Sequence, residues 1–84
     1  MVDGARSQLL VAFGASVRDL RRARLLSQET FAERVGIHRT YVGDVERGER
    51  NIGLVNIGRL AAALEITLAE LMAEVDRRRD VGAS

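Results

Sequence analysis

The chain has 84 residues, of which 46% are hydrophobic and 30% charged, and its net charge is +1. This balance is that of one soluble globular domain rather than of a disordered chain. The absence of cysteine excludes disulfides and thiolate metal sites. No apolar run is long enough to span a bilayer, and the N-terminus lacks the charged-then-apolar order of a signal peptide, so we expect a cytoplasmic protein.

The spacing of apolar residues predicts five helices and no strand, which fits a chain without proline. Ser27 and Thr67 are expected N-caps, and Gly36 and Gly48 are expected to end helices in the left-handed conformation. We expect one domain over residues 1–84 with a core at about 8–78 and frayed ends at 1–7 and 80–84. The expected helices span residues 8–24, 28–36, 38–48, 54–64 and 68–78.

Gly43 and Gly58 fall inside these predicted helices, where each costs about 1 kcal/mol relative to alanine. Such a glycine indicates close approach by another helix or by a ligand. Helix packing is the favoured explanation for Gly58, whereas the question stays open for Gly43. All thirteen basic residues are arginine. The planar guanidinium group binds phosphate and guanine through two parallel hydrogen bonds, although a G+C-rich genome explains the same bias. The run Arg77, Arg78 and Arg79 is typical of a solvated tail.

The segment 28–47, QETFAERVGIHRTYVGDVER, meets the conditions for packing two short helices across a tight turn. Ala32 is small where the two helix axes must cross, and Gly36 stands where the chain reverses. Ile37 then enters the core as a plug. A helix-turn-helix unit requires this pattern together with matching apolar faces. These faces are Phe31 and Val35 on the first helix and Val42 and Val45 on the second.

The stretch from Phe13 to Met72 resembles the phage repressor and Cro class of helix-turn-helix domains, also called the Xre class. FGASVRDLRRARLLSQETFAERVGI resembles its first two helices, HRTYVGDVERGERN its recognition helix, and IGRLAAALEITLAELM its last two helices. RTYVGDVERGERN with the following Leu-Val-Asn-Ile is also similar to controller proteins of restriction–modification systems. The resemblance implies an all-α, five-helix, lambda-repressor-like DNA-binding domain. Two departures are Leu25, where the family often has glycine, and Gly43, which replaces a side chain that often contacts DNA.

The resemblance also implies that the recognition helix, about residues 38–47, enters the major groove. Arg39 would read guanine O6 and N7, and Thr40 would touch a thymine methyl or a base edge. Asp44 would accept from a cytosine amino group or orient Arg39. The plainer alternatives are that Arg39 is merely solvated and that Asp44 is a surface acid that repels DNA.

A second set of residues is expected to hold the DNA backbone and fix the register. Gln28 would bind a phosphate at the positive end of its helix. For Tyr41, core packing is an equally good explanation, and His38 is expected to be an N-cap or a surface residue. The predicted backbone-binding residues are Ser27, Gln28, Tyr41, Arg47, Arg50 and Asn51.

One further pair is expected to be structural. Glu46 resembles a buried glutamate of the family that pairs with an arginine on the first helix, here Arg21. We expect the pair to orient the recognition helix rather than to touch bases.

Together these features predict a sequence-specific transcriptional regulator that binds a pseudo-palindromic operator in double-stranded DNA as a homodimer. Helix 68–78 is expected to supply the dimer contact. No cofactor, metal, small-molecule ligand or membrane partner is expected. One histidine and no cysteine also argue against an enzyme. One alternative is a protein-docking module, which should show an apolar rather than a polar recognition helix. The other is an antitoxin, which binds both a toxin and its own operator and usually devotes an extension to its toxin. The expected dimer residues are Leu68, Leu71, Met72 and Val75.

Overall fold

The computed structural model describes residues 4–83, which form five α-helices and, within that range, no strand. The all-α prediction is therefore confirmed. None of these helices is both long and apolar enough to cross a membrane. The helices are α1 (Gly4–Ala23), α2 (Gln28–Val35), α3 (Arg39–Glu46), α4 (Leu54–Ala63) and α5 (Leu68–Ala83).

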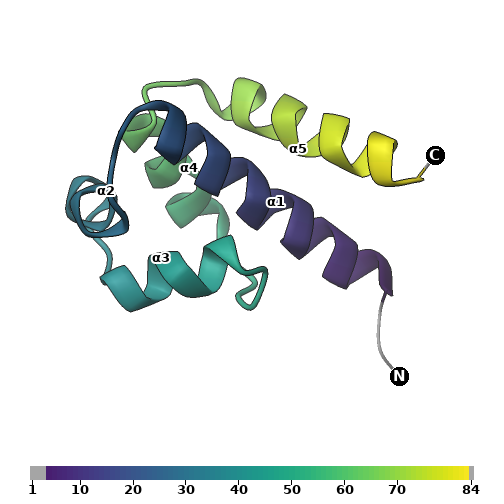
Figure 1. The fold of residues 1–84 in the computed structure, drawn as a ribbon, viewed down its shortest axis with the longest axis horizontal. Helices are drawn as coiled ribbons and strands as arrows, with labels where there is room; N and C mark the ends of the chain where they lie inside the picture. Colours follow the sequence, from purple (N-terminus) through teal and green to yellow (C-terminus); the bar gives the residue numbers. More distant parts are fainter. Residues whose placement is uncertain (1–3, 84) are drawn as a thin grey trace.

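The first and last helices are longer than the apolar pattern predicts. α1 begins at Gly4 and α5 continues to Ala83, so the fraying expected for residues 4–7 and 80–83 is wrong. The rest of that prediction, for residues 1–3 and 84, lies outside the described residues. α1 and α5 pack along each other (Figure 1). Arg78 donates to the Asp19 carboxylate across this contact, which a solvated arginine tail would not do.

α1 runs through the middle of the molecule, with α3 on one side and α5 on the other (Figure 1). One apolar core fills the space between the helices. Its fully buried large side chains come from α1, α2, α3, α5 and from α4 with its C-cap: Phe31, Leu60, Leu64, Leu71, Val17, Val42, Val45 and Val75.

Two residues expected at a dimer interface belong to this core. Leu71 and Val75 are 0% and 2% exposed, because the apolar stripe of α5 faces its own chain. That part of the prediction is wrong, since these side chains have no surface left for a partner. Leu68 is 41% exposed and Met72 is half-buried at the edge of the core.

Side-chain caps define where three helices begin. The Ser27 hydroxyl accepts from the Thr30 N–H at 3.0 Å, and the His38 Nδ1 accepts from the Thr40 N–H at 3.1 Å. Thr67 and Glu70 cap each other's backbone N–H groups, with distances of 2.8 and 3.0 Å. This reciprocal arrangement is a capping box. The expected caps at Ser27 and Thr67 are confirmed, as is the N-cap interpretation of His38.

The turn between α1 and α2 keeps its shape without the glycine that the family often has. Leu25 takes φ 59°, a left-handed conformation, and is 93% exposed. Its N–H still donates to the Arg22 carbonyl at 2.9 Å. The departure therefore preserves the turn but places a branched side chain in a backbone region that favours glycine.

Two glycines allow α1 to approach α3 closely. A Cβ added at Gly14 would lie 2.2 Å from the Val45 carbonyl oxygen, and one at Gly48 would lie 3.0 Å from the Val11 Cα. Gly48 also has φ +75°, as expected for the end of α3. By contrast, a Cβ at Gly58 would meet nothing within 4 Å, so the packing role expected for Gly58 is wrong.

Candidate nucleic-acid interface

The α2–α3 unit forms through the packing that the sequence pattern predicts. Phe31, Ala32, Val42 and Val45 are all at most 3% exposed. Gly36 closes α2 with φ 85°, and its N–H donates to the Ala32 carbonyl. This packing buries one side of α3 and leaves the opposite side at the molecular surface.

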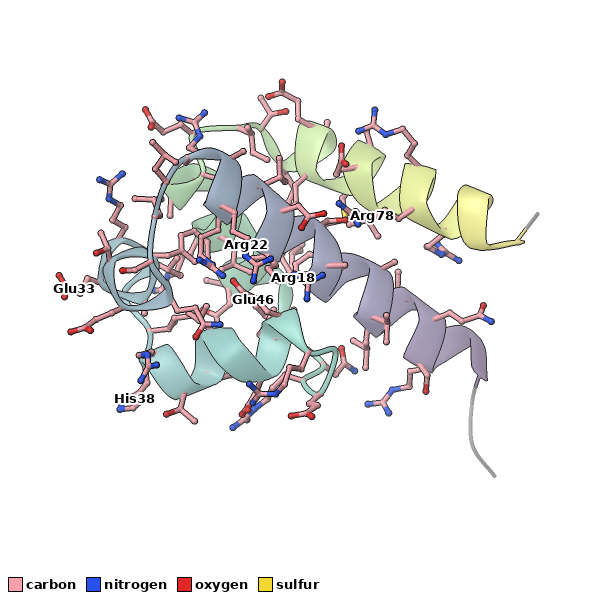
Figure 2. All side chains as sticks on the ribbon, in the orientation of Figure 1. Arg18, Arg22, Glu33, His38, Glu46 and Arg78 are labelled. Carbon is pink, nitrogen blue, oxygen red and sulfur yellow. The ribbon has the colours of Figure 1, made fainter. Side chains whose placement is uncertain are left out.

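The exposed start of α3 carries two of the predicted base-reading residues. Arg39 and Thr40 are both exposed, and they share a shallow groove of about 200 Å³ with Gln28, Gly43 and Arg47. The groove is therefore built from α3, its C-cap residue and the first residue of α2, and its lining is polar apart from a glycine. In Figure 2, His38 marks the outer end of α3 where this surface begins.

Asp44, the third predicted base-reading residue, contacts two arginines of the same surface. One carboxylate oxygen accepts from Arg47 Nη2 at 2.6 Å, and the other accepts from Arg50 Nε at 3.4 Å. The prediction that Asp44 orients Arg39 is wrong, because the arginines it holds follow it in the chain. The side chain of Asp44 is 21% exposed.

Arg47 has a second acidic partner that the sequence analysis missed. Its Nε donates to Glu49 Oε1 at 3.1 Å. This hydrogen bond, followed by the charges of Glu49 and Asp44, raises the pKa of the Arg47 guanidinium above its usual value. Glu49 lies in the irregular stretch after α3, and no motif or spacing marks such a contact beforehand.

The other predicted backbone-binding residues surround this cluster. Tyr41 packs against the core, and the Arg50 guanidinium lies over its ring, 4.9 Å from the centroid. Asn51 is exposed. Ser27 uses its hydroxyl oxygen as the α2 cap, and the Gln28 amide donates to Glu46 Oε1 at 2.9 Å. The Gln28 side chain is thus part of the packing between α2 and α3 in this structure.

Arg21 and Glu46 form a buried, two-pronged ion pair between α1 and α3. Arg21 Nε donates to Glu46 Oε2 at 2.6 Å, and Arg21 Nη2 donates to Oε1 at 3.0 Å. Arg21 Nη1 also donates to the Leu26 carbonyl at 2.8 Å. The two side chains are only 8% and 3% exposed. Figure 2 shows Glu46 between α3 and α1, where Arg18 and Arg22 also lie.

The exposed side of α3 and the stretch after it form a polar, charged surface. Among residues 4–83, no three His, Cys, Asp or Glu side chains gather so that they could hold a metal ion. The surface of α3 and the stretch that follows it carries three exposed arginines and two carboxylates that partly neutralise them. Such a surface presents hydrogen-bond donors along one edge of a helix narrow enough for the DNA major groove.

Comparison with known proteins identifies the unit. Residues 17–71 match the helix-turn-helix family model HTH_3. The chain belongs to this family. It is 38% identical over 72 residues to the control protein C.MunI of a Mycoplasma species, covering 84% of this chain and 97% of that protein.

Two solved structures extend the comparison. The restriction–modification controller protein C.AhdI from Aeromonas hydrophila is 58% identical, with a TM-score of 0.72 over 74% of this chain and 94% of that one. The controller protein C.Esp1396I, solved as a tetramer on its natural 35-base-pair operator, is 21% identical, with a TM-score of 0.79 over 84% and 93% of the two chains. The resemblance to controller proteins is therefore confirmed, while C.Esp1396I supports the shared fold alone.

Proposed function

We propose that this protein is a transcriptional regulator that binds a pseudo-palindromic operator as a homodimer and controls a restriction–modification system. The observation that carries the proposal is the exposed, polar start of α3, with Arg39 and Thr40 in one groove. The surface of a protein-docking module should be more apolar there. The proposed regulator binds DNA in the cytoplasm and has no catalytic role.

In this mechanism α3 enters the major groove with its first turn toward the bases. Arg39 donates both prongs of its guanidinium to guanine O6 and N7, a contact worth about 1–3 kcal/mol of discrimination. Thr40 lies beside it and contacts a thymine methyl or a base edge. The buried side of α3 rests on α1 and α2, so the reading side chains are held by a rigid support.

The DNA backbone is held from both ends of the reading helix. The N-terminus of α2 offers backbone N–H groups and a positive dipole end to one phosphate, beside Gln28. Arg50 and Asn51, which follow α3, reach the backbone on the other side. These contacts set position and register, whereas the sequence is read by the start of α3.

A single domain of this size reads too few base pairs to find one site in a genome. Two copies related by a two-fold axis place their recognition helices about 34–36 Å apart, one turn of DNA. The contact is proposed to use exposed aliphatic side chains of α4 and α5. Leu54 and Val55 are 72% and 70% exposed and adjacent in the chain, so water contact in the monomer is costly. Leu68 and Met72 remain available from the set expected on α5.

The first test is selection of bound duplexes from a random DNA library with wild type and with Arg39→Ala. Wild type is expected to enrich a two-fold symmetric site, and the variant to lose one guanine in each half. Arg34→Ala is the matched control, because Arg34 is an exposed arginine on α2 that lines a different groove. Weak binding without any enriched sequence would refute the operator proposal.

The dimer contact is tested by sedimentation of Val55→Glu at concentrations where wild type is dimeric. The buried charge is expected to shift the variant to monomer. Leu25→Asn is the control, since Leu25 is a more exposed aliphatic residue at the α1–α2 turn and asparagine tolerates its positive φ. A Val55→Glu protein that stays dimeric would exclude this part of α4 from the contact.

A further inference from the structure

The two arginines expected to hold phosphates are already bound to a carboxylate of their own chain. Asp44 accepts from Arg47 at 2.6 Å and from Arg50 at 3.4 Å, one arginine on each of its oxygens. An ionised carboxylate only accepts hydrogen bonds, as a DNA phosphate does. Asp44 therefore occupies one nitrogen of each guanidinium and places a negative charge beside the donors that would meet the DNA backbone.

Gly43 lies beside the folded Arg47 side chain. A Cβ at this position would come within 3.1 Å of Arg47 Nη1, so the missing side chain leaves room for the guanidinium to fold back along α3. Arg47 consequently lines the same groove as Arg39 and Thr40. Asp44 fixes this folded position, because it lies one turn before Arg47 on the same helix.

This arrangement affects the binding of non-specific DNA and of the selected sequence differently. Non-specific binding depends on arginines meeting phosphates, and a phosphate that takes the nitrogens bound here must displace the Asp44 carboxylate. The released carboxylate then faces the negative backbone. On the selected sequence, base contacts from the start of α3 hold the helix while Arg47 and Arg50 keep their bonds to Asp44. Rejecting the wrong partner through an unfavourable contact is a general route to specificity.

We propose that Asp44 is a specificity-determining residue that acts through Arg47 and Arg50 by competing with the phosphates of arbitrary DNA. This inference rests on the proposed operator-binding function. It assigns Asp44 a positioning role in place of the cytosine contact expected from the sequence. It also explains why Gly43 stands inside α3.

The test compares Asp44→Asn with wild type on two duplexes: the one that wild type enriches from a random library, and a shuffled duplex of the same length and composition. Binding is followed by fluorescence anisotropy over a range of salt concentrations. Affinity for the shuffled duplex is expected to rise about tenfold, and affinity for the selected duplex less than threefold. The salt dependence on the shuffled duplex should steepen by about one to two phosphate contacts, at roughly 0.9 per contact.

Two further variants separate positioning from charge. Glu33→Gln removes an exposed carboxylate of α2 but leaves the bonds of Arg47 and Arg50 in place, so discrimination between the duplexes should stay within about twofold of wild type. Gly43→Ala changes no charge but displaces Arg47, and it should weaken binding to the selected duplex more than to the shuffled one. Thermal unfolding of each variant verifies that it is folded.

The outcomes distinguish this inference from the function on which it rests. Equal gains on both duplexes for Asp44→Asn would show a simple charge effect, and a loss on both would show a direct DNA contact. Either result overturns the inference and leaves the operator proposal standing. If wild type enriches no duplex, the operator proposal fails and the inference fails with it.

Discussion

Removing the Glu46 carboxylate tests whether the α1–α3 ion pair holds the reading helix. Glu46→Ala deletes three hydrogen bonds, two from Arg21 and one from Gln28, and leaves a guanidinium whose side chain is 8% exposed without its counter-charge. Breaking a buried pair in this way costs about 3–5 kcal/mol. A domain of this length has about 4–13 kcal/mol of total stability, so the variant should lose about a quarter of it or more.

Chemical denaturation with urea measures this loss directly. The melting temperature should fall by more than about 10 °C, at roughly 4–8 °C per kcal/mol. Glu65→Ala is the control. Its hydrogen bond to Arg24 is 2.8 Å long but the two side chains are 39% and 65% exposed, so less than about 1 kcal/mol is expected. A Glu46→Ala protein within about 0.5 kcal/mol of wild type would refute the reasoning.

The two members of the pair should be strongly non-additive. Replacing both at once, Arg21→Met with Glu46→Leu, removes the desolvated charges together and should recover most of the stability lost by the single change. DNA binding provides a second measurement. If the pair orients α3, the apolar double variant should be stable and yet bind the selected duplex less well than wild type.

Three further predictions concern the glycines inside helices, the left-handed Leu25 and the Asp19 carboxylate. Gly14→Ala should lower the free energy of unfolding in urea by at least about 1–3 kcal/mol, because its Cβ meets a backbone carbonyl. Gly58→Ala has open space around it and should raise that free energy by about 0.5–1 kcal/mol. Equal effects of the two changes would contradict the packing described for Gly14. Leu25→Gly should raise the melting temperature by a few degrees, since it relieves a left-handed leucine for about 0.5–1 kcal/mol, and a lower melting temperature would exclude strain at this turn. The hydrogen bond from Arg78 lowers the pKa of Asp19, so the unfolded chain binds more protons and stability should fall as the pH drops from about 4 through the lower folded pKa. Urea midpoints at several acidic pH values should show this fall in wild type and a weaker one in Asp19→Asn, and identical slopes would refute the assignment.

The helical plan was predictable because it depends on periodic or local signals. Ser27 and Thr67 lie next to the N–H groups that they cap, and the apolar stripe of α2 and α3 repeats with the period of a helix. The dimer residues were harder to predict, because an apolar stripe does not say whether its own chain or a partner covers it. Leu71 and Val75 illustrate this, since α5 turns them toward α1 and the core.

The candidate site was predictable only in part for a related reason. Resemblance locates Arg39 and Thr40 at the start of the reading helix, and it also suggests the pairing of Arg21 with Glu46. Contacts among exposed polar side chains carry no periodicity, so Asp44 was expected to face bases or Arg39. Gly14 was missed because a close crossing of α1 on α3 depends on the tertiary packing of residues 31 positions apart.

Two separate sets of contacts act on α3, one on its buried side and one on its exposed side. The buried side of α3 is fixed to α1 by the Arg21–Glu46 pair and by the close approach at Gly14, which sets the orientation of the reading helix before DNA arrives. The exposed side is restrained by Asp44, which holds Arg47 and Arg50. A single substitution on the buried side should therefore alter stability and binding to all sequences together, because it moves the helix as a whole. A change at Asp44 should alter discrimination with little effect on stability, and measuring both quantities for the same variants separates the two roles.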